Sequence, residues 1–76
     1  MQKYLVRFNG IHNKESFIKA TNIVPYEIDL EYGNTVVDGK SAIGVYACPD
    51  KTPIRCTFHT DTEDIKNKFK MWIVTD

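Results

Sequence analysis

Potentially reactive side chains gather in one short segment of the sequence, where His12 is followed closely by Lys14 and Glu15. An imidazole is a nucleophile near neutral pH, and free backbone N–H groups at the start of a helix bind anions. A histidine just before a helix would therefore be suited to carrying a phosphoryl group. The simpler alternative is a surface histidine at a junction between a loop and a helix, with no reaction.

The other residues capable of chemistry favour structural interpretations. Cys48 and Cys56 lack the close spacing of a zinc site, so reduced and mostly buried thiols are expected. His59 lies on the polar side of an expected strand, where an exposed surface residue is the simple explanation. Ser41 is placed to cap a short helix and is also a candidate phosphorylation site, and the two roles are compatible. No metal or cofactor is indicated.

Composition restricts the classes of function. The chain has 76 residues, which we expect to form one domain over residues 1–76. Ten Lys and Arg residues balance ten Asp and Glu residues, so no net charge favours nucleic acid as a partner. No apolar run is long enough for membrane insertion, and the N-terminus lacks the apolar core of a signal peptide. We therefore expect a cytoplasmic protein.

Apolar periodicity predicts seven elements. Period-two alternation indicates strands and a helical apolar stripe indicates helices, which gives strands over residues 2–8, 26–32, 35–37 and 54–59 and helices over 13–24, 42–47 and 62–72. Asn13 is the expected N-cap of the first helix, and Thr60 with Glu63 has the spacing of a capping box before the last. The order β-α-β-β-α-β-α predicts an α+β fold, with a four-stranded antiparallel sheet and three helices on one face.

Three segments resemble HPr, the histidine-containing phosphocarrier of the bacterial sugar phosphotransferase system. Gly10-Ile11-His12 lies between the first strand and the first helix, where that family has its active-site motif. The segment Asp29-Leu30-Glu31-Tyr32 is similar to the family's NLEY-like sequence. The segment 39–45, GKSAIGV, is similar to its regulatory-serine motif. The resemblance implies an HPr-like open-faced β-sandwich.

The same resemblance implies a function. His12 would accept a phosphoryl group from phosphoenolpyruvate through Enzyme I and pass it to sugar-permease components, and Lys14 would stabilise the phosphate. Ser41 would be a regulatory site for a serine kinase. Partners would dock on an apolar patch formed by Ala42, Ile43 and Tyr46. Such a protein is a phosphoryl carrier rather than a stand-alone enzyme, and we expect a monomer.

The motif departs from the family at two positions, which leaves alternatives open. Lys14 stands where the family has arginine, and Glu15 stands where it has proline. A carboxylate about 6 Å from a phosphate dianion costs about 1–1.5 kcal/mol in water, so Glu15 would slow transfer without forbidding it. One alternative is a divergent HPr-like regulatory or binding module that docks through the Ser41 helix with little or no phosphotransfer. Another is an unrelated α+β sandwich of ferredoxin type that binds a small ligand or RNA.

Overall fold

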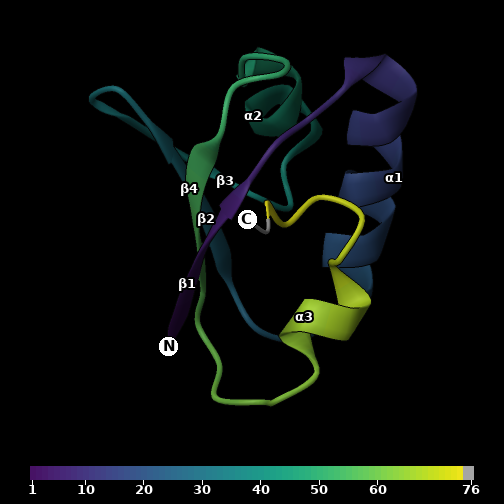
Figure 1. The fold of residues 1–76 in the computed structure, drawn as a ribbon, viewed down its shortest axis with the longest axis vertical. Coiled ribbons are helices and arrows are strands. Elements are labelled where there is room, and N and C mark those ends of the chain that lie inside the picture. Colours follow the sequence, from purple (N-terminus) through teal and green to yellow (C-terminus); the bar gives the residue numbers. More distant parts are fainter. Residues whose placement is uncertain (75–76) are drawn as a thin grey trace.

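The computed structural model describes residues 1–74, which form seven elements in two layers (Figure 1). Their bounds in chain order are β1 Gln2–Val6, α1 Gly10–Ile23, β2 Ile28–Tyr32, β3 Thr35–Asp38, α2 Ala42–Ala47, β4 Ile54–Phe58 and α3 Ile65–Lys68. This is the predicted order β-α-β-β-α-β-α. The bounds of α2 agree with the prediction from sequence, whereas α1 begins earlier and α3 is much shorter.

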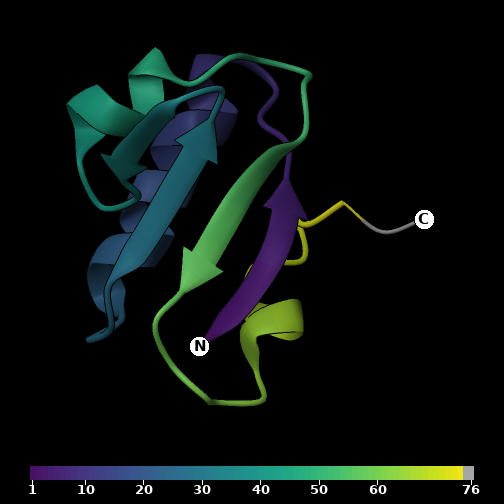
Figure 2. The same ribbon diagram turned by 90° about the vertical axis from the view of Figure 1, so that its left-hand side faces the viewer.

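The strands form one antiparallel sheet in the order β1-β4-β2-β3 (Figure 2). The last strand of the chain therefore lies between β1 and β2. Cys56 at the middle of β4 is opposite Tyr4 of β1 on one side and opposite Leu30 of β2 on the other. The three helices lie behind one face of this sheet and leave the other open, which is the predicted open-faced sandwich (Figure 2).

The core lies between the sheet and the helices. Alternate residues of the strands face it, so Ile28 and Leu30 of β2 are fully buried while Glu31 faces solvent with Arg55 of β4. The apolar stripe of α1 covers these strands from the other side. Its Phe17 is fully buried, with ring centroids 4.9 Å from Phe8 and 5.2 Å from Trp72 in edge-to-face geometry.

The last helix is shorter than the predicted range 62–72. Thr60 and Glu63 do not form a capping box, because the Thr60 hydroxyl accepts the N–H of Thr62. The helix ends at Lys68, although three apolar residues beyond it are still buried: Phe69, Trp72 and Ile73. After a turn the chain extends along β1, where Val6 and Ile73 form an isolated antiparallel bridge. The β-branched residues and the free edge of β1 favour this extended ending over more helix.

Candidate functional site

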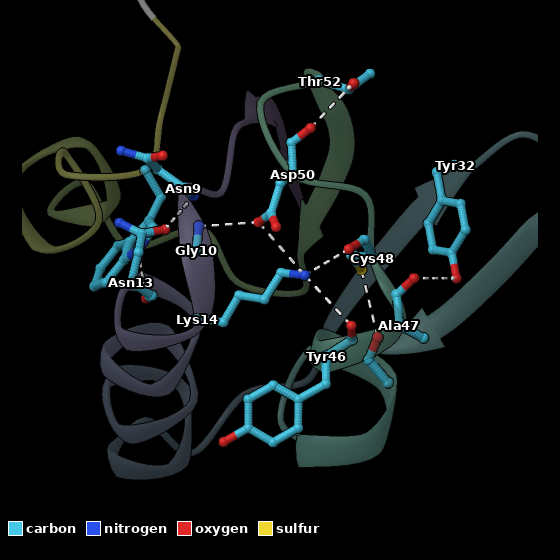
Figure 3. A network of polar contacts seen from close by, with 12 residues as sticks. Asn9, Gly10, Asn13, Lys14, Tyr32, Tyr46, Ala47, Cys48, Asp50 and Thr52 are labelled. Atoms are coloured by element: carbon cyan, nitrogen blue, oxygen red, sulfur yellow. Dashed lines mark hydrogen bonds and ion pairs between the residues drawn. The ribbon is translucent and has the colours of Figure 1, made fainter.

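Helix α1 begins earlier than the sequence suggested, at Gly10 rather than at Asn13. The N–H of Asn9 donates to Asn13 Oδ1 at 3.0 Å, and the N–H of Gly10 donates to Asp50 Oδ1 at 3.0 Å (Figure 3). Gly10 has φ +85°, a backbone conformation that glycine adopts without strain. The prediction of Asn13 as the N-cap is therefore wrong, and His12 lies inside the first turn of α1 instead of before it.

The His12 imidazole is open to solvent on nearly all sides. Its side chain is 97% exposed, and Nδ1 lies 3.2 Å from Glu15 Oε1 one turn further along α1. Residues three apart on a helix share a face, which explains this pairing. A partner can therefore reach the imidazole freely, but a carboxylate already lies beside one of its nitrogens.

The Lys14 ammonium is directed toward the end of α2. Its side chain is only 7% exposed, and Nζ donates to the carbonyl oxygens of Cys48 at 2.6 Å and Tyr46 at 3.3 Å (Figure 3). The Asp50 carboxylate lies 3.5 Å from the same nitrogen. A cation is favourable beside the last carbonyls of a helix. In this arrangement Lys14 joins α1 to α2, and its position does not support the expected contact with a phosphate on His12.

Asp50 is a residue that sequence reasoning missed. It follows α2 in a loop, and its carboxylate reaches the first turn of α1, where it contacts Gly10 and Lys14. A parallel bridge between Phe8 and Asp50, with the N–H of Lys51 donating to the Phe8 carbonyl at 2.7 Å, holds this loop against the start of α1. Forty positions separate Asp50 from Gly10, so no local pattern marks the contact.

Ser41 caps α2, as the sequence predicted. Its hydroxyl accepts the N–H of Gly44 at 3.2 Å, and the first turn of α2 contains no acidic residue. The half-buried side chain lies at the entry to a helix whose bounds also agree with the prediction. Whether a kinase modifies Ser41 stays a prediction.

The outer side of α2 presents the three residues expected to dock partners. Ile43 is 84% exposed and Tyr46 is 43% exposed, and Ala42 beside them is exposed as well. The opposite side of the helix holds the fully buried Val45. Ala42, Ile43 and Tyr46 thus form an accessible apolar patch, and a docking role for it stays a prediction.

The remaining candidates are His59 and the two cysteines. His59 follows β4 and places Nε2 2.8 Å from Asp29 Oδ2 at the surface. Cys48 and Cys56 are free and buried, and burial raises the pKa of the Cys48 thiol to about 11 and raises the pKa of Cys56 as well. In residues 1–74, no group of three or more His, Cys, Asp or Glu side chains is placed to hold a metal ion. None of the helices in that range is long and apolar enough to cross a bilayer.

No protein-family model matches the sequence, and no curated protein matches it. Among solved structures, the chain is similar to the crystal structure of HPr-C-His from Thermoanaerobacter tengcongensis, with a TM-score of 0.72 and 16% sequence identity. The match covers 92% of this chain and 84% of that chain. The fold of the second alternative, a sandwich of ferredoxin type, is therefore wrong. The element order, the sheet and this structural match together establish that the chain has the HPr fold.

Proposed function

We propose that this protein is a phosphocarrier that accepts a phosphoryl group on His12. The observation that carries the proposal is the position of His12 on an HPr fold: the imidazole is 97% exposed in the first turn of the helix that follows β1. In the family that the sequence resembles, the acceptor histidine lies at this junction. The donor would be Enzyme I charged by phosphoenolpyruvate, and the acceptors would be sugar-permease components.

Phosphoryl transfer places two requirements on the carrier protein. A neutral imidazole nitrogen attacks the phosphorus of the phosphorylated donor, an N–P bond forms on His12, and the bond from phosphorus to the donor breaks. The site must leave His12 accessible and must tolerate about two negative charges on it. Exposure meets the first requirement, while the carboxylate of Glu15 opposes the second.

A second function is favoured by the position of Lys14. Its ammonium is held by two carbonyl oxygens and Asp50, so the phosphate would lack the cation that the family's arginine supplies. The protein would then be an HPr-like binding module with little phosphotransfer. It would dock partners on the patch of Ala42, Ile43 and Tyr46, and phosphorylation of Ser41 by a serine kinase would regulate that docking.

Phosphate uptake separates the two functions. We expect wild-type protein incubated with phosphoenolpyruvate and Enzyme I to gain one acid-labile phosphate, as measured by intact mass and ³¹P NMR. His12→Ala should abolish the uptake, and His59→Ala, the matched control at the second histidine, should leave it unchanged. If the wild type gains no phosphate under conditions that fully modify an ordinary HPr, the carrier function fails and the binding module becomes the conclusion.

A further inference from the structure

The Asp50 carboxylate occupies the position at the start of α1 where an anion would be stabilised. It accepts the N–H of Gly10 at 3.0 Å and lies 3.5 Å from the Lys14 ammonium (Figure 3). Gly10 and Lys14 are placed symmetrically about His12, two residues before it and two after it. A helix N–H and an ammonium are the groups that bind a phosphate in other proteins, and here an internal carboxylate uses both.

The charges joined by these contacts are unfavourable to a phosphate on His12. The site contains one ammonium, that of Lys14, and two carboxylates, those of Asp50 and Glu15. Asp50 lies 3.5 Å from the Lys14 ammonium, and Glu15 lies 3.2 Å from the His12 imidazole. The three charged side chains therefore carry a net charge of −1. The nearby cations Arg7 and Lys51 line a separate open pocket on the side of Asn9 and Asn13. Neither His12 nor Asp50 is among the residues that line this pocket.

We propose that Asp50 is a regulatory residue of the acceptor site, whose negative charge slows phosphorylation of His12. The effect has two sources, which are direct repulsion of the incoming phosphoryl group and neutralisation of the Lys14 ammonium by the carboxylate beside it. The inference rests on the proposed role of His12 as acceptor. It adds that the rate of acceptance is set by a loop residue far away in the sequence, in addition to the neighbouring Glu15.

Asp50→Asn removes the charge and keeps the shape. The amide oxygen of asparagine can still accept the N–H of Gly10, so the start of α1 stays capped. The two carbonyl bonds of Lys14 also remain. Asp61→Asn is the matched control, because Asp61 is a fully exposed carboxylate in the loop between β4 and α3 that pairs with the N-terminus instead of with α1.

The measurement uses phosphoramidate, a small phosphoryl donor that needs no enzyme. The imidazole attacks its phosphorus and the P–N bond of phosphoramidate breaks. Ammonia leaves and takes up the ring proton that is released as phosphohistidine forms. Uptake at each histidine is followed by NMR or by peptide mass. His59 serves as an internal reference, since its carboxylate partner is Asp29 and the substitution does not touch it.

We expect Asp50→Asn to raise the initial rate at His12 by about fivefold relative to His59, because one carboxylate charge no longer repels the phosphoryl group. Added salt should reduce the gain, and Asp61→Asn should leave the ratio unchanged. A ratio that Asp50→Asn does not raise overturns the proposal, because a purely structural role would alter melting and not this ratio.

Enzyme I supplies the second arm of the experiment. A gain for Asp50→Asn with both donors supports the proposal and the carrier function together. A gain with phosphoramidate and no uptake from Enzyme I by any variant supports the effect of Asp50 and contradicts the carrier function. Uptake from Enzyme I by the wild type without any gain in the variant contradicts the effect of Asp50 and leaves the carrier function standing.

Discussion

The two helices nearest the candidate site begin in different ways. The start of α2 is held locally, by the Ser41 hydroxyl and the N–H of Gly44 three residues away. The start of α1 has one local bond, from the Asn9 N–H to Asn13 Oδ1, and two bonds from distant segments. Asp50, 40 residues further along the chain, accepts the N–H of Gly10, and the Trp72 indole N–H donates to the carbonyl of Asn13 across 59 residues at 3.1 Å. The outer face of α2 is therefore placed by its own sequence, whereas the position of His12 depends on the packing of distant loops.

This difference bears on how the protein could change its behaviour. A substitution in the loop after α2 or in the C-terminal segment can displace the first turn of α1, because both contact it directly. The apolar patch on α2 follows a locally capped start, and its ties to distant segments lie at the end of the helix: the two carbonyls that Lys14 holds and the Ala47 carbonyl, which accepts from the Tyr32 hydroxyl at 3.4 Å. Docking and phosphoryl acceptance should thus respond differently to substitutions, which the predictions below examine.

The largest effect is expected from Glu15→Pro. The sequence alone places Glu15 in the first turn of a helix that begins near Asn13, where proline is well tolerated. In the structure Glu15 is the sixth residue of α1, so proline would remove a backbone hydrogen bond and clash with the preceding turn. We expect the free energy of unfolding to fall by about 3 kcal/mol, as measured by denaturant unfolding.

Glu15→Ala is the matched control for that experiment. Alanine keeps the helix and removes the carboxylate from His12, so stability should change little while phosphorylation of His12 becomes faster. A stable Glu15→Pro protein would show that α1 begins later than Gly10 and that its start is set locally, as that of α2 is.

A smaller loss is expected from Lys14→Met. Methionine keeps most of the buried stem and removes the ammonium, which leaves the carbonyls of Tyr46 and Cys48 without their donor. We expect a loss of about 2 kcal/mol in chemical denaturation, since unsatisfied buried acceptors are costly. Lys19→Met, at an exposed position on the same helix, should change stability by less than about 0.5 kcal/mol. Equal effects for the two variants would contradict the joining role of Lys14.

Most of the fold could be predicted from sequence because its signals are local. Alternation in β2 and β4, the stop at Pro25 and the serine before α2 each act within a few residues. The early end of α3 could not be predicted from sequence. The apolar spacing of Phe69 and Trp72 fits a longer helix, but a turn after Lys68 buries both residues equally well. What decides between them is the free edge of β1, which exists only after the sheet has formed.

At the candidate site, positions within an element could be predicted from sequence better than contacts between distant segments. The cap at Ser41 and the exposed face of α2 follow from position within an element, whereas His12 was expected before α1 and lies in its first turn. The direction of the Lys14 side chain has no signal in the sequence, because a flexible four-carbon stem reaches the best acceptors that folding brings near. Asp50 carries no signal at all, as its contact with Gly10 arises from loop packing across the whole chain.

The smallest effect is expected from Ser41→Ala, which tests whether the start of α2 is held locally. Removing the hydroxyl leaves the N–H of Gly44 without its cap, and the loss should be about 1 kcal/mol in thermal or chemical unfolding. Ser41→Asp keeps an acceptor and should recover most of that loss, whereas Ser16→Ala on the exposed side of α1 should change little. Because the cap is local, neither Ser41 variant should alter the rate of phosphate uptake at His12. A changed rate would show that a substitution at the start of α2 also displaces the first turn of α1, through the carbonyls that Lys14 holds. The two helix starts would then be one coupled unit.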